Sequence, residues 1–259
     1  VYALTMRGAP GEEPSLDLLG FVYAYAGYAA WFEGGPTTPE EIRARRARPI
    51  FTGDFRPGFE AFVRWLREYG PPGAASHTWV DMMNLYAQGR AAVLMPSAIN
   101  GYAAVGITED PRVRNGTAFA ASPVGPGGKP IQSFWTFSLG INRRSRNKDK
   151  AFAVLSYLTG KQAMQAFAER TQWPTVTMRS VLYSPVLIQR YGREELELNE
   201  RGVLNSDVRY FPYIPELSEF MDKIGTAASR AVAGESVDAV LNDLQTWALE
   251  RMYRAGYYR

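Results

Sequence analysis

Apolar residues recur every three or four positions in several parts of the chain, and this spacing predicts amphipathic helices. One helix is predicted over residues 16–32 with Ser15 as its N-cap, and another over residues 55–70, ending at Gly70 before two prolines. The second helix carries its apolar face on Phe59, Phe62, Val63 and Leu66. Such helices are typical of the surface of a packed core.

Short apolar runs predict strands between the helices. The predicted strands are residues 1–7, 91–97 and 117–124. Further helices are predicted over 79–90, 148–160, 161–171 and 236–256, the last with an apolar stripe of Val237, Val240, Leu241, Leu244 and Leu249. Residues 33–54 are expected to be a polar connection. This alternation of helices and short strands predicts an α/β architecture, with helices covering a sheet.

Composition narrows the class of protein. The 259 residues are 46% hydrophobic and 21% charged, and the formal net charge is +3, which favours a globular chain without the basic surface of a nucleic-acid-binding protein. The chain has no cysteine, so disulfides and thiolate metal sites are excluded. No apolar run predicts a membrane-spanning helix, and the opening VYALTMRG lacks the pattern of a signal peptide. We expect the chain to start mid-fold.

The residues that could carry a reaction are few. His77 is the only histidine, no G-x-S-x-G elbow accompanies it, and an ordinary surface or capping role is expected for it. The stretch GPGGKP lacks the spacing of a phosphate-binding loop, so it predicts a turn or hinge. No catalytic residue, metal or cofactor is predicted. Glu13 and Glu216 could serve a glycosidase only if they faced one another across a sugar.

Aromatic residues beside turns, together with Arg, Asn, Glu and Ser, suit carbohydrate, because sugar faces stack on rings and hydroxyls pair with planar polar groups. IQSFWTFSLGIN (131–142) places Phe134, Trp135 and Phe137 after a turn-rich segment, either for core packing or for stacking on a ligand. Alternation along a strand favours the core for Phe134 and Phe137. Core or inter-helix packing is expected for the tryptophans of the predicted helices, Trp31, Trp65, Trp79 and Trp247.

Six segments resemble, in order, the extracellular solute-binding proteins of carbohydrate ABC importers (family 1), in particular the sugar- and polyol-binding subgroup. They are RGAPG, YGPPGAAS, NLYAQGRAAVLM, SPVGPGG, SFWTFSLGIN and IPELSEFMDKIGTAASRAVAGES. The resemblance implies a periplasmic-binding-protein-like (type II, venus-flytrap) fold of two lobes with the first part of the N-terminal lobe missing. Residues 1–120 would belong mostly to the second lobe, 121–178 to the first, and 179–259 to the second.

The resemblance also implies where ligand would bind. Arg7 and Glu13 would lie on a loop at the cleft floor, Trp135 would stack on the ligand, and Pro96 departs from the acidic residue frequent in polyol binders. The full set of implied binding residues is Arg7, Glu13, Ser97, Asn100, Trp135, Trp173, Arg179, Tyr213 and Glu216. Closure about the crossing SPVGPGGKP is expected when ligand binds.

The function implied is binding, without catalysis, of a sugar alcohol, mono- or disaccharide for delivery to an ABC permease. The expected partners are that ligand, the permease subunits and the rest of the N-terminal lobe, with no nucleic acid. The location implied is periplasmic or extracellular, with or without a lipid anchor. A carbohydrate-active hydrolase and a non-binding interaction lobe are the alternatives.

Overall fold

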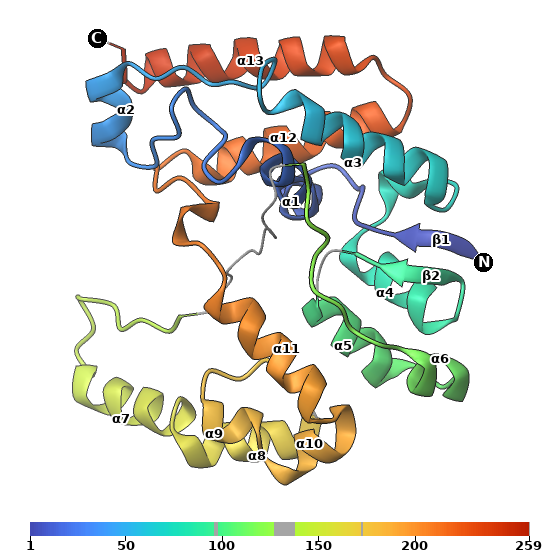
Figure 1. Ribbon diagram of the computed structural model, residues 1–259. Helices are drawn as coiled ribbons and strands as arrows, with labels where there is room; N and C mark the ends of the chain where they lie inside the picture. The colour runs from blue at the N-terminus through green and yellow to red at the C-terminus, as the bar shows by residue number, and fades with distance from the viewer. Residues whose placement is uncertain (96–97, 127–137, 172, 259) are drawn as a thin grey trace. The chain divides into compact units, whose positions relative to one another are not determined.

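A computed structural model describes residues 1–95, 98–126, 138–171 and 173–258 (Figure 1). Contacts divide the chain into two compact units. Unit 1 comprises Val1–Thr117, Ala121–Ser133 and Asn205–Arg259, and unit 2 comprises Ala118–Ala120 and Phe134–Leu204. Residues 179–204 therefore pack with unit 2 and not with the closing helices, whereas the assignment of segments to lobes stays a prediction.

Unit 1 places helices around a two-stranded parallel sheet in which Tyr2 pairs with Ala91 and Leu4 with Val93. Helix α3 contacts β1, and α4 contacts both strands. The elements of unit 1 are β1 (Tyr2–Thr5), α1 (Glu13–Ala26), α2 (Pro39–Arg45), α3 (Arg56–Tyr69), η1 (Ala74–Ser76), α4 (Trp79–Ala87), β2 (Ala91–Leu94), α5 (Ala98–Ile107), α6 (Pro111–Gly116), η2 (Val208–Tyr210), α12 (Leu217–Val232) and α13 (Val237–Arg254).

Unit 2 is helical in its described residues. Its small core lies between α8, α9, α10 and α11 and includes Ala168, Val181, Leu187 and Leu196. The elements of unit 2 are α7 (Lys148–Leu158), α8 (Lys161–Thr171), α9 (Arg179–Leu182), α10 (Pro185–Tyr191) and α11 (Arg193–Leu204).

The predicted core positions of α3 are confirmed, because Phe59, Phe62, Val63 and Leu66 are all buried. These side chains pack on α1 and extend toward α12. In α13, Val240, Leu241 and Leu244 are buried as predicted, and the stripe continues through Ala248 and Met252, while Leu249 is only half-buried. Trp31 is fully buried, Trp65 packs edge-on against Phe21, and Trp247 packs against Phe220, as expected.

Three local predictions were wrong. Helix α1 begins at Glu13, and Ser15 does not cap it, since the Ser15 hydroxyl donates to the carbonyl of Glu12 inside the first turn. Residues 33–54 contain helix α2, which Thr38 caps by accepting a hydrogen bond from the amide of Glu41. Residues 117–124 form no continuous strand. The starts of α1 and α2 depend on local capping, and a strand at residues 117–124 would need a pairing partner distant in sequence. The pattern of apolar positions records neither kind of contact.

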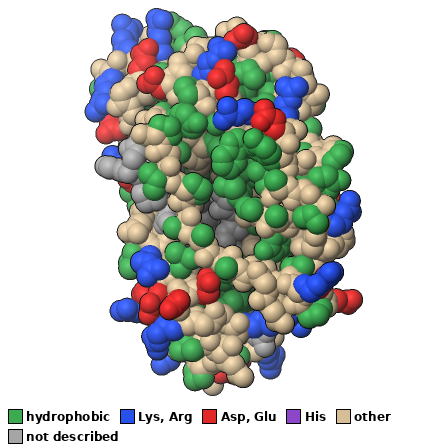
Figure 2. Space-filling model, turned by 45° about the vertical axis from the view of Figure 1, so that its right-hand side comes forward, with side chains coloured by type: hydrophobic (Ala, Val, Ile, Leu, Met, Phe, Trp, Pro, Cys, Tyr) green, Lys and Arg blue, Asp and Glu red, His purple; other side chains and the backbone are tan. Residues whose placement is uncertain are grey.

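The surface carries charges of both signs. In Figure 2, lysine and arginine side chains (blue) lie in mixed groups with aspartate and glutamate side chains (red). Several charged side chains of the described residues form ion pairs, as in Arg56–Asp238 at 2.6 Å and Arg251–Glu219 at 2.7 Å. Exposed pairs of this kind contribute little to stability, so apolar packing, such as that of α1 on α3 and α12, is the larger contribution in unit 1.

Gly58 permits the close approach of α3 to α1. A Cβ built at this position would lie 2.3 Å from the Cα of Val22 and 2.6 Å from its amide nitrogen, and backbone cannot yield as a side chain can. Gly58→Ala should therefore destabilise the fold by about 1–3 kcal/mol, although alanine is the better helix former. The measurement is urea denaturation.

Gly106 in α5 is the matched control, because nothing lies within 4 Å of the place that an added Cβ would take. Gly106→Ala should leave stability unchanged or raise it by up to about 1 kcal/mol. Equal effects of the two substitutions would show that close helix packing does not explain the glycine at position 58.

Candidate functional site

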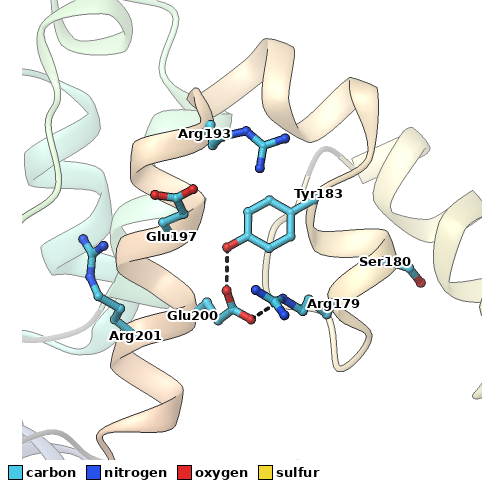
Figure 3. A pocket seen from close by; sticks show the side chains of 7 residues that line it. All are labelled: Arg179, Ser180, Tyr183, Arg193, Glu197, Glu200 and Arg201. Carbon is cyan, nitrogen blue, oxygen red and sulfur yellow. Dashed lines mark hydrogen bonds and ion pairs between the residues drawn. The ribbon is translucent and has the colours of Figure 1, made fainter.

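Two groups of polar side chains in the described residues are candidate sites, one within each unit. In unit 2 they line an open pocket of 710 Å³ (Figure 3). The hydroxyl of Tyr183 donates to Glu200 Oε2 at 2.6 Å, and Arg179 Nε lies 2.8 Å from Glu200 Oε1. Burial raises the pKa of Tyr183, and the neighbouring Glu200 raises it further. Both oxygens of Glu200 are therefore occupied by groups of the pocket itself.

The remaining lining residues of this pocket are Ser180, Arg193, Glu197 and Arg201. The Arg193 guanidinium lies 5.4 Å from the centre of the Tyr183 ring, within the range of a cation–π contact. Arg179, a predicted binding residue, thus lies in a mixed-charge pocket. Trp173, also predicted, belongs to the loop after α8, where it is half-buried and its amide donates to Thr171 Oγ1.

In unit 1 the polar group lies where the two parallel strands end. The segment after β1 turns at Gly8, whose amide donates to the His77 carbonyl at 2.9 Å, directly before α4. The amide of Met95, which follows β2, donates to the Thr5 carbonyl at 3.1 Å. The N-termini of α1 and α4 and the carboxyl ends of both strands therefore meet at one edge, the usual ligand position in α/β folds.

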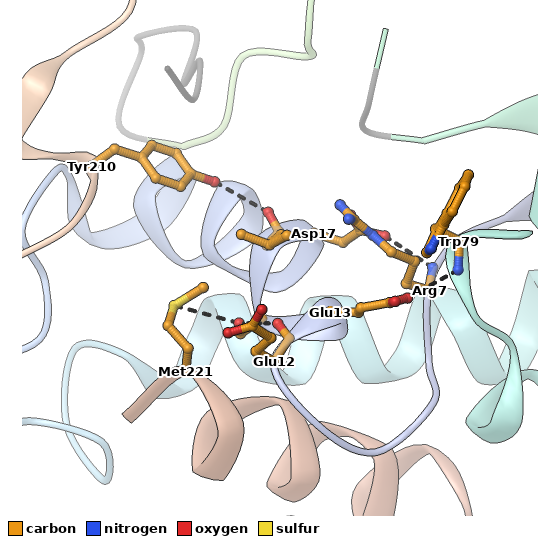
Figure 4. A network of polar contacts seen from close by, with 9 residues as sticks. Arg7, Glu12, Glu13, Asp17, Trp79, Tyr210 and Met221 are labelled. Carbon is orange, nitrogen blue, oxygen red and sulfur yellow. Dashed lines mark hydrogen bonds and ion pairs between the residues drawn. The ribbon is translucent and has the colours of Figure 1, made fainter. Parts of the chain in front are cut away.

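Arg7 and Asp17 form a buried ion pair at this edge (Figure 4). The Asp17 side chain is fully buried and accepts from the Arg7 amide at 2.9 Å, from Nε at 2.7 Å and from NH2. In the described contacts of this guanidinium, NH1 has no partner and NH2 keeps a second N–H. Asp17 was not among the predicted site residues. Its position as an aspartate inside the apolar run LDLLGFVYAYAGYAAWF could have indicated a buried charge that needs a partner.

The electrostatics of the pair follow from its burial. Burial raises the pKa of Asp17, and the charge and hydrogen bonds of Arg7 oppose that shift. Burial lowers the pKa of Arg7, but the charge and hydrogen bonds of Asp17 together with nearby groups outweigh this and raise it. Tyr210, whose hydroxyl donates to the Leu16 carbonyl at 3.3 Å, also has its pKa raised by burial and by the charge of Asp17.

Glu13 connects the starts of two helices. Its carboxylate accepts from the amide of Trp79, the first residue of α4, at 3.0 Å. This adds to the capping box of Thr78 and Asp81 at the same helix end. Glu13 also interacts electrostatically with Arg7. The predicted residues Arg7 and Glu13 therefore do lie together.

The prediction of core or inter-helix packing was wrong for Trp79, because this residue is 44% exposed. The helical spacing of apolar residues predicted a packed position for Trp79. It does not show that α4 begins at the end of the sheet, where this residue is exposed. Its amide donates to Glu13, which fixes the backbone of Trp79 at the edge where Arg7 and Glu13 lie (Figure 4). Sequence reasoning missed this exposed aromatic residue.

The other predicted binding residues are spread more widely. Asn100 is buried in α5, the helix that follows β2. Tyr213 is 59% exposed, and its hydroxyl donates to the Val208 carbonyl at 2.7 Å. Ser97 and Trp135, with Phe134 and Phe137, lie outside the described residues.

Glu216 already has partners in the packing of α12 on α13. Its buried carboxylate accepts from the Tyr257 hydroxyl at 3.0 Å and lies 3.5 Å from Arg251. Burial and Glu216 raise the pKa of Tyr257 to about 12. The described contacts of Glu216 are therefore structural.

The described residues contain no group of three or more His, Cys, Asp or Glu placed to hold a metal ion. None of the helices in the described ranges has the length and apolar character needed to cross a membrane.

Comparison with known proteins identifies the family. The sequence profile of the bacterial extracellular solute-binding proteins matches residues 5–165. The chain belongs to this family.

Solved structures of solute-binding proteins share the fold of this chain. A solved solute-binding protein from Agrobacterium vitis S4 with bound D-mannitol superposes with a TM-score of 0.79 at 20% identity, over 100% of this chain and 63% of its own. One from Agrobacterium radiobacter K84 in complex with ribitol gives 0.75 at 21% identity, over 96% and 59%. The fold is that of the type II periplasmic binding proteins, as expected from the resemblance.

A curated relative of similar extent is the mannitol-binding protein of Pseudomonas aeruginosa, 27% identical over 99% of this chain. The chain spans 59% of the length of that solute-binding protein.

The Arg7–Asp17 pair gives a stability prediction for this member of the family. Arg7→Gln leaves the Asp17 carboxylate buried without its ion-pair partner and should cost about 3–5 kcal/mol in the free energy of unfolding. The double variant Arg7→Gln/Asp17→Asn should lose less than the two single losses added together. Denaturant titration of the three variants measures this coupling.

Arg112, paired with Asp110 at 2.7 Å but 89% exposed, provides the control. Arg112→Gln should leave the unfolding midpoint nearly unchanged, because an exposed pair is screened by water. Additive losses at positions 7 and 17 would contradict a stabilising role for the buried pair.

Proposed function

We propose that this chain is part of an ABC-importer binding protein that holds a sugar alcohol or small sugar at the carboxyl ends of β1 and β2. The observation that carries the proposal is the Arg7 guanidinium, fixed by Asp17 at an edge that also presents the exposed indole of Trp79. Guanidinium and carboxylate groups hydrogen-bond hydroxyls, and an indole face covers the apolar side of a carbon chain.

The relatives support this ligand class. The curated relative is a mannitol-binding protein, and the two solved structures hold D-mannitol and ribitol. These ligands are short, neutral chains of hydroxyl-bearing carbons. A site combining one fixed guanidinium, one carboxylate and one indole suits such a chain. Asn100 and Ser97, after β2, are further proposed contacts, and Trp135 remains a proposed second stacking surface.

The remaining parts of the proposal concern the whole protein. We place it in the periplasm or outside the cell, where it would deliver ligand to membrane permease subunits. Four further residues stay predicted ligand contacts: Trp173, Arg179, Tyr213 and Glu216. The carboxylate of Glu216 is already paired with Tyr257 and Arg251, which counts against a role for it in binding. The proposal is binding without turnover. A hydrolase with Glu13 and Glu216 as its carboxylates is disfavoured by that same pairing.

The direct test is a panel of D-mannitol, ribitol and maltose added to the purified chain. Ligand that binds only the native state raises its stability by RT ln(1 + [L]/Kd), which is about 2.7 kcal/mol at a hundredfold excess over Kd. We expect a rise in melting temperature with at least one polyol and no product by chromatography. An unchanged melting temperature with every ligand, or the appearance of product, would contradict the proposal.

Trp79 gives a sharper prediction. Trp79→Ala removes an exposed stacking surface and should weaken polyol binding by about tenfold, with little change in the melting temperature without ligand. Calorimetric titration and thermal unfolding separate the two effects.

Trp65 is the matched control, because it is half-buried between α3 and α1 against Phe21. Trp65→Ala should lower the melting temperature and leave the affinity of the folded protein unchanged. A Trp79→Ala protein with full affinity would remove this indole from the site.

A further inference from the structure

The charge at the carboxyl end of the sheet is unusual for a site built around arginine. Arg7, the arginine among the described residues of this network, is neutralised by Asp17, which is fully buried and cannot move away without leaving its charge unpaired. Glu13 adds a second carboxylate that interacts with Arg7, and Asp81 lies at the adjacent start of α4. Among these four charged residues, carboxylates outnumber guanidinium groups three to one.

The geometry of Arg7 also limits what it can bind. A free guanidinium recognises a carboxylate or phosphate through two parallel hydrogen bonds from neighbouring nitrogens. Asp17 Oδ1 accepts from both Nε and NH2, so one edge of the Arg7 guanidinium is already taken by a carboxylate of the protein. NH1 and the second N–H of NH2 remain as donors, and a neutral hydroxyl accepts from them without bringing charge.

We infer that this site selects uncharged polyhydroxy ligands and rejects their carboxylate and phosphate analogues, with Asp17 as the residue that sets this specificity through Arg7. The inference rests on the proposed function, since it assigns selectivity to the same site. An anionic analogue would meet Glu13 and Asp17 as like charges and would find a guanidinium whose charge Asp17 already neutralises. Rejection by like charge is a common source of ligand discrimination.

Asp17 is thus a positioning residue with a second consequence. It fixes the direction of NH1, and it cancels the charge that would otherwise attract anions. If the Asp17 carboxylate were only structural, its substitution would lower the stability of the fold and would change the affinity for all ligands by the same factor. A charge-setting carboxylate changes the ratio between neutral and anionic ligands, so that ratio is the decisive readout.

The experiment compares D-mannitol with D-mannonate, which replaces one terminal CH2OH group by a carboxylate, by calorimetric titration at pH 8. Wild-type protein should bind D-mannonate at least about a hundredfold more weakly than D-mannitol. Asp17→Asn leaves an uncompensated Arg7 and should reduce this ratio at least about tenfold, even where D-mannitol binding itself weakens.

Two further variants keep the test decisive. Glu13→Gln removes a carboxylate from the same edge and should reduce the ratio in the same direction, so the inference remains testable if Asp17→Asn does not fold. Asp238→Asn makes the same change of charge at the start of α13, where Asp238 pairs with Arg56, and should leave the ratio unaltered.

The outcomes are distinguishable. If wild-type protein binds D-mannitol and D-mannonate about equally, the specificity inference fails while the proposed function stands. If Asp17→Asn and Glu13→Gln leave the ratio unchanged, the charges at this edge do not set specificity. If neither ligand binds wild-type protein and the wider panel is also negative, the proposed function and the inference fail together.

Discussion

The buried ion pair between Arg7 and Asp17 links the end of strand β1 to helix α1, and the candidate site depends on it. Asp17 accepts from both the backbone amide and the side chain of Arg7, so it fixes the turn of the chain as well as the guanidinium. A charge pair removed from water is costly to break, because each partner alone would remain desolvated. The position of Arg7 is therefore set by the core of unit 1 and not by a flexible loop.

The helices around this pair bring the other polar groups to it. α1 and α4 both begin at the edge where the parallel strands end, and Glu13 connects their starts through the amide of Trp79. The close approach of α3 at Gly58 holds α1 in place further along its length, at Val22. Because these helices begin beside the strand ends, the charged side chains of Arg7 and Glu13 and the indole of Trp79 lie at the same edge of the sheet.

Much of this architecture follows from local patterns in the sequence. The apolar faces of α3 and α13 could be predicted because their spacing repeats over several turns, and β1 and β2 because each is a short apolar run between turns. The start of α1 and the existence of α2 depend on capping contacts within a few residues, and the pattern of apolar positions does not encode them.

The site was less predictable because it depends on contacts between distant segments. Arg7 and Glu13 were predicted through a family resemblance, and they lie together. Asp17 looked like a polar interruption of an apolar helix, and only the fold shows that it faces Arg7. Trp79 has the same helical spacing as a core residue, and its exposure is decided by where α4 begins.

The central claim is that a polyol binds at the Arg7 guanidinium beside Trp79. It is tested most directly by nuclear magnetic resonance of protein labelled with 15N at arginine and tryptophan, with the Arg7 Nε–H and Trp79 indole signals assigned through Arg7→Lys and Trp79→Phe. Titration with D-mannitol should shift both signals with one common dissociation constant, equal to that from calorimetry. Binding by calorimetry with neither signal perturbed would place the ligand elsewhere and contradict the account.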